Sequence, residues 1–241
     1  MRVSLTKPTD TQLFYEDLDV PTANGMPQLY ANLTKNDSIP NVNGGTLWTD
    51  TINKRFYLFG GEFQGDQPPP TVFTLWSFDT LNLIWESFGQ SAQTIINGIS
   101  YGAGVSVSER GEGYYYGGWM SSNSMPGWGS GPAVATSTLI RYDMDSNSWT
   151  NSTGPADRIR RAEGSMVFLP ISDGGMLVYL GGIRDMWRNG TVVGQPMDEI
   201  LLYDVLSSKW YTQSAGGTVP QMRRRFCMGA AWAKDQSSYN M

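Results

Sequence analysis

The stretch Leu139-Ile140-Arg141-Tyr142-Asp143, followed six residues later by Trp149, decides the fold because it recurs along the chain. An aromatic-Asp pair precedes a tryptophan by this same spacing at three places: Phe78-Asp79 with Trp85, Tyr142-Asp143 with Trp149, and Tyr203-Asp204 with Trp210. Upstream of each, an apolar run closes on a glycine pair, at Gly60-Gly61, Gly117-Gly118 and Gly181-Gly182. Self-similarity of this kind predicts a repeat architecture.

Each copy of the repeat is predicted to hold four β-strands. The constant spacing from Asp to Trp indicates a tight turn, because an Asp carboxylate accepts hydrogen bonds from backbone amides about two residues on. The spacing from glycine pair to tryptophan varies from 25 to 32 residues, which indicates a loop of variable length. Runs of small residues, such as 101–107 and 164–169, supply the first strands. The repeated glycines, aspartates and tryptophans are therefore expected to be structural, with the tryptophans packed between neighbouring sheets.

The glycine pair, the aromatic-Asp pair and the spaced tryptophan resemble the Kelch repeat, and residues 44–241 are similar to fungal Kelch and galactose-oxidase-like propeller proteins. The resemblance implies an all-β fold, a β-propeller in which each copy is one four-stranded antiparallel blade. The copper site of galactose oxidase uses two histidines, a tyrosine and a cysteine-linked tyrosine. This sequence has no histidine and no counterpart of that set, so the resemblance does not extend to copper chemistry.

Blade boundaries are expected near residues 44–90, 91–154 and 155–215, and a fourth blade starts at 216–241, with its first strand over 225–233. Residues 1–43 form an N-terminal segment that is expected to contribute at most a partial blade. Closed propellers have four to eight blades. Three full blades with partial ones predict an incomplete ring, and we expect the sequence to be a fragment or a truncated gene product.

Composition excludes several classes of function. The net charge of −5 opposes binding to nucleic acid or to an anionic membrane. Without histidine the chain lacks the usual general base and the usual nitrogen ligand of zinc and copper, so no catalytic residue, metal site or cofactor is expected. Cys227, the single cysteine, has apolar neighbours that predict burial. The sequence shows neither a bilayer-spanning apolar run nor a signal peptide.

A candidate binding face follows from the strand directions. In an antiparallel blade, the loops between the second and third strands emerge on the same side as the connections between blades. This side, the loop face, is expected to carry exposed aromatic and basic side chains, which dominate many protein interfaces. The candidate partner-binding residues are Trp119, Trp128, Trp187, Arg161, Arg184, Arg188 and Arg225. Alternatively, the arginines are structural or solvated, and the tryptophans cover their own blade edges.

The leading hypothesis is a non-catalytic scaffold for protein interaction or at the cell surface, with another protein or a cell-surface glycan as partner. A glycan-binding or glycan-processing propeller is the alternative, using loop aromatics and a carboxylate pair such as Glu62 with Asp66 or Asp198 with Glu199. A purely structural ectodomain of a membrane-anchored protein is a third hypothesis. Four N-glycosylation sequons favour a secreted or cell-surface location over the cytoplasm, at Asn32, Asn36, Asn151 and Asn189.

Overall fold

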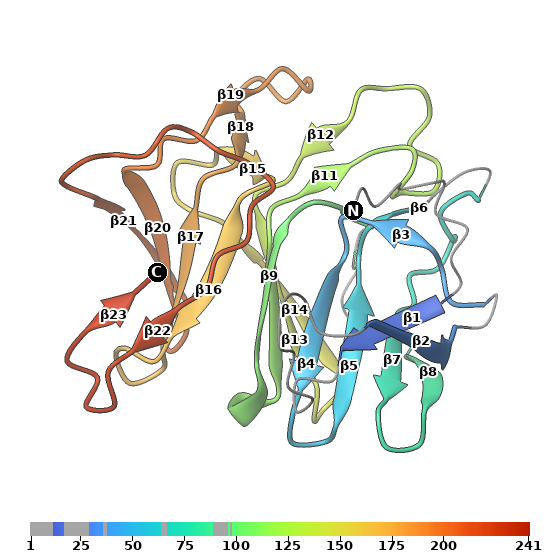
Figure 1. Cartoon of the computed structure of the whole chain (residues 1–241). Helices are drawn as coiled ribbons and strands as arrows, with labels where there is room; N and C mark the ends of the chain where they lie inside the picture. Colours follow the sequence, from blue (N-terminus) through green and yellow to red (C-terminus); the bar gives the residue numbers. More distant parts are fainter. Residues whose placement is uncertain (1–11, 17–28, 36–37, 64–66, 89–95, 97) are drawn as a thin grey trace.

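Three four-stranded antiparallel sheets stand side by side in the computed structural model, one for each copy of the repeat (Figure 1). The structure describes residues 12–16, 29–35, 38–63, 67–88, 96 and 98–241. Blade I contains β4 (Thr46–Asp50), β5 (Arg55–Phe59), β7 (Leu75–Asp79) and β8 (Ile84–Phe88). Blade II contains β9 (Ala103–Val107), β10 (Glu112–Tyr116), β13 (Thr138–Asp143) and β14 (Ser148–Thr153). Blade III contains β16 (Ser165–Leu169), β17 (Met176–Leu180), β20 (Glu199–Asp204) and β21 (Lys209–Ser214).

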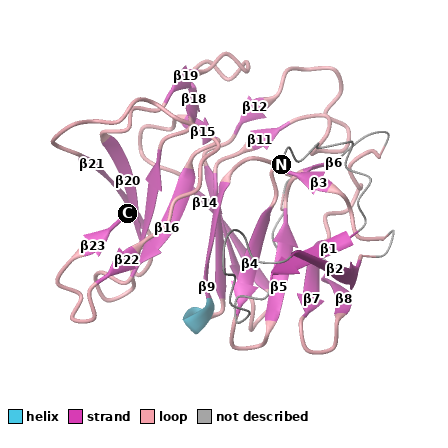
Figure 2. Ribbon diagram, viewed as in Figure 1, coloured by secondary structure: helices cyan, strands magenta, loops and turns pink. Residues whose placement is uncertain are grey.

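Shorter strands occupy the remaining segments. Near the amino terminus β1 (Gln12–Glu16) pairs with β2 (Leu29–Thr34), and after blade III β22 (Ala231–Trp232) pairs with β23 (Tyr239–Asn240). The connections hold β3 (Val42–Asn43), β6 (Glu62–Phe63), β11 (Trp119–Met120), β12 (Val134–Ala135), β15 (Arg160–Ala162), β18 (Ile183–Asp185) and β19 (Val193–Gly194). Within the described ranges, the single helical segment is the short turn Ser108–Arg110 (Figure 2). The predicted all-β propeller of four-stranded blades is confirmed, and the described blades form an open arc.

Two details of the carboxyl-terminal segment differ from expectation. The first strand after blade III is expected over 225–233, but β22 covers Ala231–Trp232 alone. Cys227 is exposed instead of buried. Phe226, Met228 and Ala230 are partly buried, and Met228 and Ala230 pack against blade III, so Cys227 lies on the outward side of an alternating segment. The assignment of residues 1–43 to a partial blade stays a prediction.

The aspartates of the aromatic-Asp pairs close the turn into the fourth strand. The Oδ1 atoms of Asp79, Asp143 and Asp204 accept hydrogen bonds from the backbone amides three residues ahead, at 3.0, 2.9 and 2.8 Å. Asp79 also accepts one from the amide two residues ahead, the position expected from the sequence. The hydrogen bonds that fix the turn explain why the Asp-to-Trp spacing is constant.

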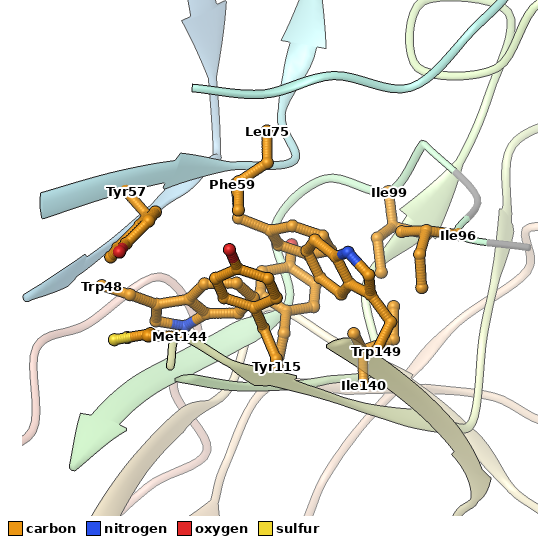
Figure 3. Close-up of a cluster of buried hydrophobic side chains, with 11 residues drawn as sticks. Trp48, Tyr57, Phe59, Leu75, Ile96, Ile99, Tyr115, Ile140, Met144 and Trp149 are labelled. Atoms are coloured by element: carbon orange, nitrogen blue, oxygen red, sulfur yellow. The ribbon is translucent and has the colours of Figure 1, made fainter. Parts of the chain in front are cut away.

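The repeated tryptophans occupy equivalent places in the three blades. Each lies directly opposite the aromatic residue of the aromatic-Asp pair, with ring centroids 5.2, 4.4 and 5.1 Å apart for Trp85, Trp149 and Trp210. Trp149 also lies 5.5 Å from Phe59 of blade I, and Trp210 lies 4.8 Å from Tyr116 of blade II. Figure 3 shows Trp149 within the cluster that fills the space between blades I and II. Trp149 and Trp210 therefore join neighbouring sheets, as their spacing predicts, whereas the ring contacts of Trp85 are with Phe56 and Phe78 of its own blade.

The second glycine of each pair connects its blade to the next unit. The amides of Gly61, Gly118 and Gly182 donate to carbonyl oxygens in the following inter-blade segment, at 2.7, 2.8 and 2.9 Å. All three glycines have positive φ, between 85° and 105°. A Cβ on Gly118 would lie 2.7 Å from the carbonyl oxygen of Ser100. Both the backbone angle and the close approach therefore require glycine.

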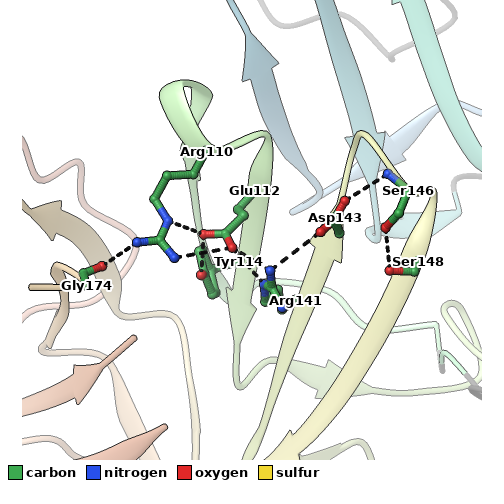
Figure 4. Close-up of polar contacts among 8 residues, drawn as sticks. All are labelled: Arg110, Glu112, Tyr114, Arg141, Asp143, Ser146, Ser148 and Gly174. Carbon is green, nitrogen blue, oxygen red and sulfur yellow. Dashed lines mark hydrogen bonds and ion pairs between the residues drawn. The ribbon is translucent and has the colours of Figure 1, made fainter. Parts of the chain in front are cut away.

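A buried carboxylate joins blades II and III at the end opposite the loop face (Figure 4). Glu112 accepts hydrogen bonds from Arg110 Nε at 2.7 Å, Tyr114 Oη at 2.7 Å and Arg141 Nη2 at 2.5 Å. Arg110 also donates to the carbonyl oxygen of Gly174 in blade III, at 2.8 Å. Burial opposes ionisation of Glu112, but these donors outweigh it and hold its pKa below the ordinary value.

Candidate functional site

The long loops and the inter-blade segments gather on one face, where Figure 1 shows β11, β12, β15, β18 and β19 together at the top of the arc. The glycine pairs bend the chain there, and the strands that follow pair with inter-blade residues or with the returning part of their own loop. Thus β3 pairs with β6, β11 with β12, and β18 with both β15 and β19. The loop face is therefore ordered by small sheets, which the loop composition did not predict.

A chain of main-chain hydrogen bonds runs along the inside of the arc beneath the loop face. The amide of Tyr101 donates to the carbonyl oxygen of Gly44, Glu163 donates to Tyr101, and Arg225 donates to Glu163, at 2.7, 2.7 and 2.8 Å. These four residues stand just ahead of successive blades, and all have φ between 52° and 66°. Equivalent backbone geometry thus places unlike side chains next to one another at the centre.

The side chains of Tyr101, Glu163 and Arg225 border a cavity of about 360 Å³, which we call the central pocket. Its lining residues come from blade I through to the segment after blade III: Glu62, Tyr101, Trp119, Pro132, Ala133, Glu163, Asn189, Gly190 and Arg225. The loop of blade III closes over the loop of blade II, since a Cβ on Gly190 would lie 2.8 Å from the carbonyl oxygen of Ala133. The central pocket is therefore assembled from several blades.

Glu163 is the buried charge of the central pocket, with 3% of its side chain exposed. Its Oε1 accepts hydrogen bonds from Arg225 Nη2 at 2.7 Å and from Trp119 Nε1 at 3.3 Å. The Arg225 guanidinium also lies over the Tyr101 ring, 4.4 Å from its centroid, in a cation–π contact. The hydrogen bond with Glu163 raises the pKa of Arg225, and burial raises the pKa of Tyr101.

The three candidate tryptophans have different surroundings. Trp119 is half-buried over Ala135, Ala162 and Ile183, and borders the central pocket. Trp128 is also half-buried, because it folds back on its own loop and donates Nε1 to the carbonyl oxygen of Pro132 at 3.2 Å. Trp187 is 59% exposed between β18 and β19. Trp187 is therefore the exposed member of the three, whereas Trp119 and Trp128 are partly covered, which fits the alternative in which loop tryptophans fold back.

The four candidate arginines also differ. Arg161 is fully buried and bonds to Asp157 at 2.5 Å and to Gln195 at 2.9 Å. Burial opposes its charge, but the hydrogen bond with Asp157 helps to keep the pKa of Arg161 above the ordinary value. Arg184 bonds to the same Gln195 and pairs with Glu199 at 2.6 Å. Arg188 is exposed in the loop beside Trp187, and Arg225 lies in the central pocket.

Sequence reasoning missed Tyr101 and Glu163 as site residues. Their side chains have nothing in common, so no residue pattern marks the position. A signal was present, since each directly precedes a glycine at the start of a first strand, as Gly44 precedes Gly45. Of the two carboxylate pairs, Glu62–Asp66 includes a residue outside the described ranges. In the other, Asp198 is exposed while Glu199 pairs with Arg161 and Arg184.

The sequons lie in different contexts. Asn151 is exposed on β14, the outer strand of blade II, and Asn189 is exposed in the loop between β18 and β19. Asn32 belongs to β2, and Asn36 lies outside the described residues. In the part of the chain that the structure describes, no helix has the length and apolar character needed to cross a membrane.

A scan against models of known protein families finds no match for this chain. Among curated proteins, the chain is similar to a Kelch repeat-containing protein of Arthroderma benhamiae, with 28% identity over 258 aligned residues. The alignment covers 92% of this chain and 36% of that relative, so the chain spans about a third of the relative's length. Together with the four-stranded blades, this similarity confirms the predicted resemblance to Kelch-repeat propellers.

Proposed function

We propose that this Kelch propeller is a non-catalytic scaffold that binds another protein through its loop face. The observation that carries the proposal is an exposed apolar and basic surface around β18 and β19, which we call the hairpin patch. It consists of Met186, Trp187, Arg188, Val193 and Met222. Clustered exposed apolar side chains on a soluble protein mark interaction sites, and Trp with Arg supplies much of the binding energy at protein interfaces.

The hairpin patch has features of a preformed surface. The loop between β18 and β19 is fixed at its base by Asp185, which accepts hydrogen bonds from the amide of Asn189 at 3.3 Å and from the amide of Ala135 in blade II at 3.1 Å. Because this base is already ordered, binding a partner there costs less conformational entropy than ordering a free loop. Arg188 adds a positive charge, which suits a partner with an apolar surface flanked by carboxylates.

The first test measures binding of a purified partner, identified by mass spectrometry after affinity capture. We expect Trp187→Ala with Arg188→Ala to weaken binding by at least about 2 kcal/mol, the size of an interface hot spot. Leu81→Ala is the control, because Leu81 is 74% exposed in the turn between β7 and β8, on the opposite end of blade I. Unchanged affinity of the folded double variant would reject the hairpin patch.

We also propose a secreted or cell-surface location, supported by the exposed sequons. Asn151 is exposed on β14, the outer strand of blade II, and is not among the residues that line the central pocket. On expression in a eukaryotic secretory host, we expect a glycosidase-sensitive mass on the wild type that Asn151→Gln reduces by one glycan. Intact mass spectrometry checks this, and an unmodified Asn151 in the secreted protein would count against the location.

A further inference from the structure

The central pocket contains one carboxylate, that of Glu62, with which no arginine of the described chain forms an ion pair. Glu62 and Glu163 contribute two carboxylates, and Arg225 contributes the guanidinium among its lining residues. Arg224 reaches Glu163 from outside the lining, with its own side chain 58% exposed. Because both arginines pair with Glu163, Glu62 is the group of the central pocket that favours a cationic over an anionic ligand.

Two acceptor sites in the central pocket are not fully used. Glu163 Oε2 is buried and accepts no hydrogen bond from the described residues, although Arg224 Nη1 lies 3.2 Å away. Glu62 makes no ion pair within the described chain, and its Oε1 receives one long hydrogen bond from Ser100 Oγ at 3.4 Å. A carboxylate oxygen that lacks a good donor is stabilised by one, so a donor that enters the central pocket would be stabilised beside Glu62 or beside Glu163 Oε2.

Aromatic rings complete the lining. Arg225 over Tyr101 shows that a cation is accommodated against an aromatic face in this cavity. Trp119 presents a second ring at the pocket wall, held by its hydrogen bond to Glu163. Carboxylates beside aromatic faces form a setting that binds ammonium and guanidinium groups. The volume of about 360 Å³ lies in the range of ligand pockets, roughly 300–1,000 Å³.

We propose that the central pocket receives a basic side chain, a lysine or an arginine, from the protein that docks on the loop face. This inference rests on the proposed function, because the residue is supplied by the partner of that face. Asn189 and Gly190 of the loop between β18 and β19 form one wall of the central pocket, so a partner on the hairpin patch lies beside its opening. Glu62 and Glu163 Oε2 accept the incoming donors.

The test uses the full chain and small probes. Nα-acetyl-lysine amide is titrated while the indole ¹H–¹⁵N signal of Trp119, assigned with Trp119→Phe, reports the central pocket. Nα-acetyl-norleucine amide is the uncharged control and chitobiose is the sugar probe. Glu62→Gln removes one charge of the pocket, and Glu109→Gln is the matched control because Glu109 is exposed on the opposite end of blade II.

We expect the lysine probe to shift the Trp119 signal, and its Kd to rise at least about tenfold in Glu62→Gln but not in Glu109→Gln. Equal Kd in wild type and Glu62→Gln, or equal binding of the norleucine probe, would overturn the inference. A shift with chitobiose and none with the lysine probe would assign the pocket to glycans instead. Partner binding that depends on Trp187 and Arg188 but not on Glu62 would leave the docking face standing and reject the basic anchor.

Discussion

Gly118 has a backbone conformation that a side chain opposes in two ways. Its φ of 102° is unfavourable for an L-residue, and a Cβ would lie 2.7 Å from the carbonyl oxygen of Ser100. We expect Gly118→Ala to lower the free energy of unfolding by about 2–4 kcal/mol, combining backbone strain with a clash. Chemical denaturation measures the change.

Two glycine controls separate these causes. Gly127 has φ of 74° but open space around its Cβ position, so Gly127→Ala is expected to cost about 1–2 kcal/mol from strain alone. Gly216 has neither a positive φ nor a neighbour within 4 Å, so Gly216→Ala should change stability by less than about 0.5 kcal/mol. A loss in Gly118→Ala no larger than in Gly127→Ala would contradict the role of close approach.

Among single residues, sequence analysis predicted those that keep the same residue type in every repeat. It missed those that share only their position in the repeat. Asp143 and Trp149 are visible because turn closure and inter-blade packing each require one kind of side chain. Tyr101 and Glu163 share no residue type, because main-chain atoms make their common contact, and the glycine that follows each is the signal for their position. Sequence analysis left open whether Trp128 folds back, since the outcome depends on its contact with Pro132.

The turn between the third and fourth strands makes the blades sensitive to acid. Hydrogen bonds from the amides of Asn82 and Ser207 lower the pKa of Asp79 and of Asp204 below the ordinary 3.8. Burial opposes ionisation of Asp143, but the amide of Ser146 and other donors outweigh it, so its pKa is lowered as well. Because the folded pKa values lie below the unfolded ones, this stabilisation is present above the unfolded pKa and is lost as pH falls through the folded pKa values.

We therefore expect the Tm of the wild type to fall more steeply below about pH 4 than that of a variant with Asn at positions 79, 143 and 204. Asparagine keeps the accepting oxygen but does not titrate, so the turn is retained. Scanning calorimetry from pH 6 to pH 3 makes the comparison. Parallel curves for the two proteins would show that these carboxylates do not contribute to acid unfolding.

At the scale of elements, the strands of each blade could be predicted and the small sheets of the loop face could not. The glycine pair marks the end of β10, and the aromatic-Asp pair and the tryptophan mark β13 and β14, since each strand is long enough to carry part of the repeated pattern. Two-residue strands such as β11 and β12 carry no pattern. They form because the glycine pair redirects the chain toward the next inter-blade segment, which is a property of the assembled blades.

The arc as a whole depends on contacts between blades. Trp210 packs on Tyr116 of blade II, and its Nε1 donates to the carbonyl oxygen of Thr153 at 3.1 Å. We expect Trp210→Phe to cost about 1 kcal/mol through the lost hydrogen bond, and Trp210→Ala to cost about 3 kcal/mol and lower the m-value as blade III unfolds separately. Urea denaturation measures both. Tyr211→Ala, an exposed neighbour on β21, is the control, and an unchanged m-value in Trp210→Ala would argue against coupling through this contact.

The main-chain bonds that connect Gly44, Tyr101, Glu163 and Arg225 leave the choice of side chain at each of these positions open. The same main-chain hydrogen bond is repeated from blade to blade, and Tyr101, Glu163 and Arg225 each place a different side chain in the central pocket. Exchanging these residues among blades should therefore change which ligand the central pocket binds without disturbing the main-chain hydrogen bonds. One scaffold can thus acquire many specificities by substitution at a single position per repeat.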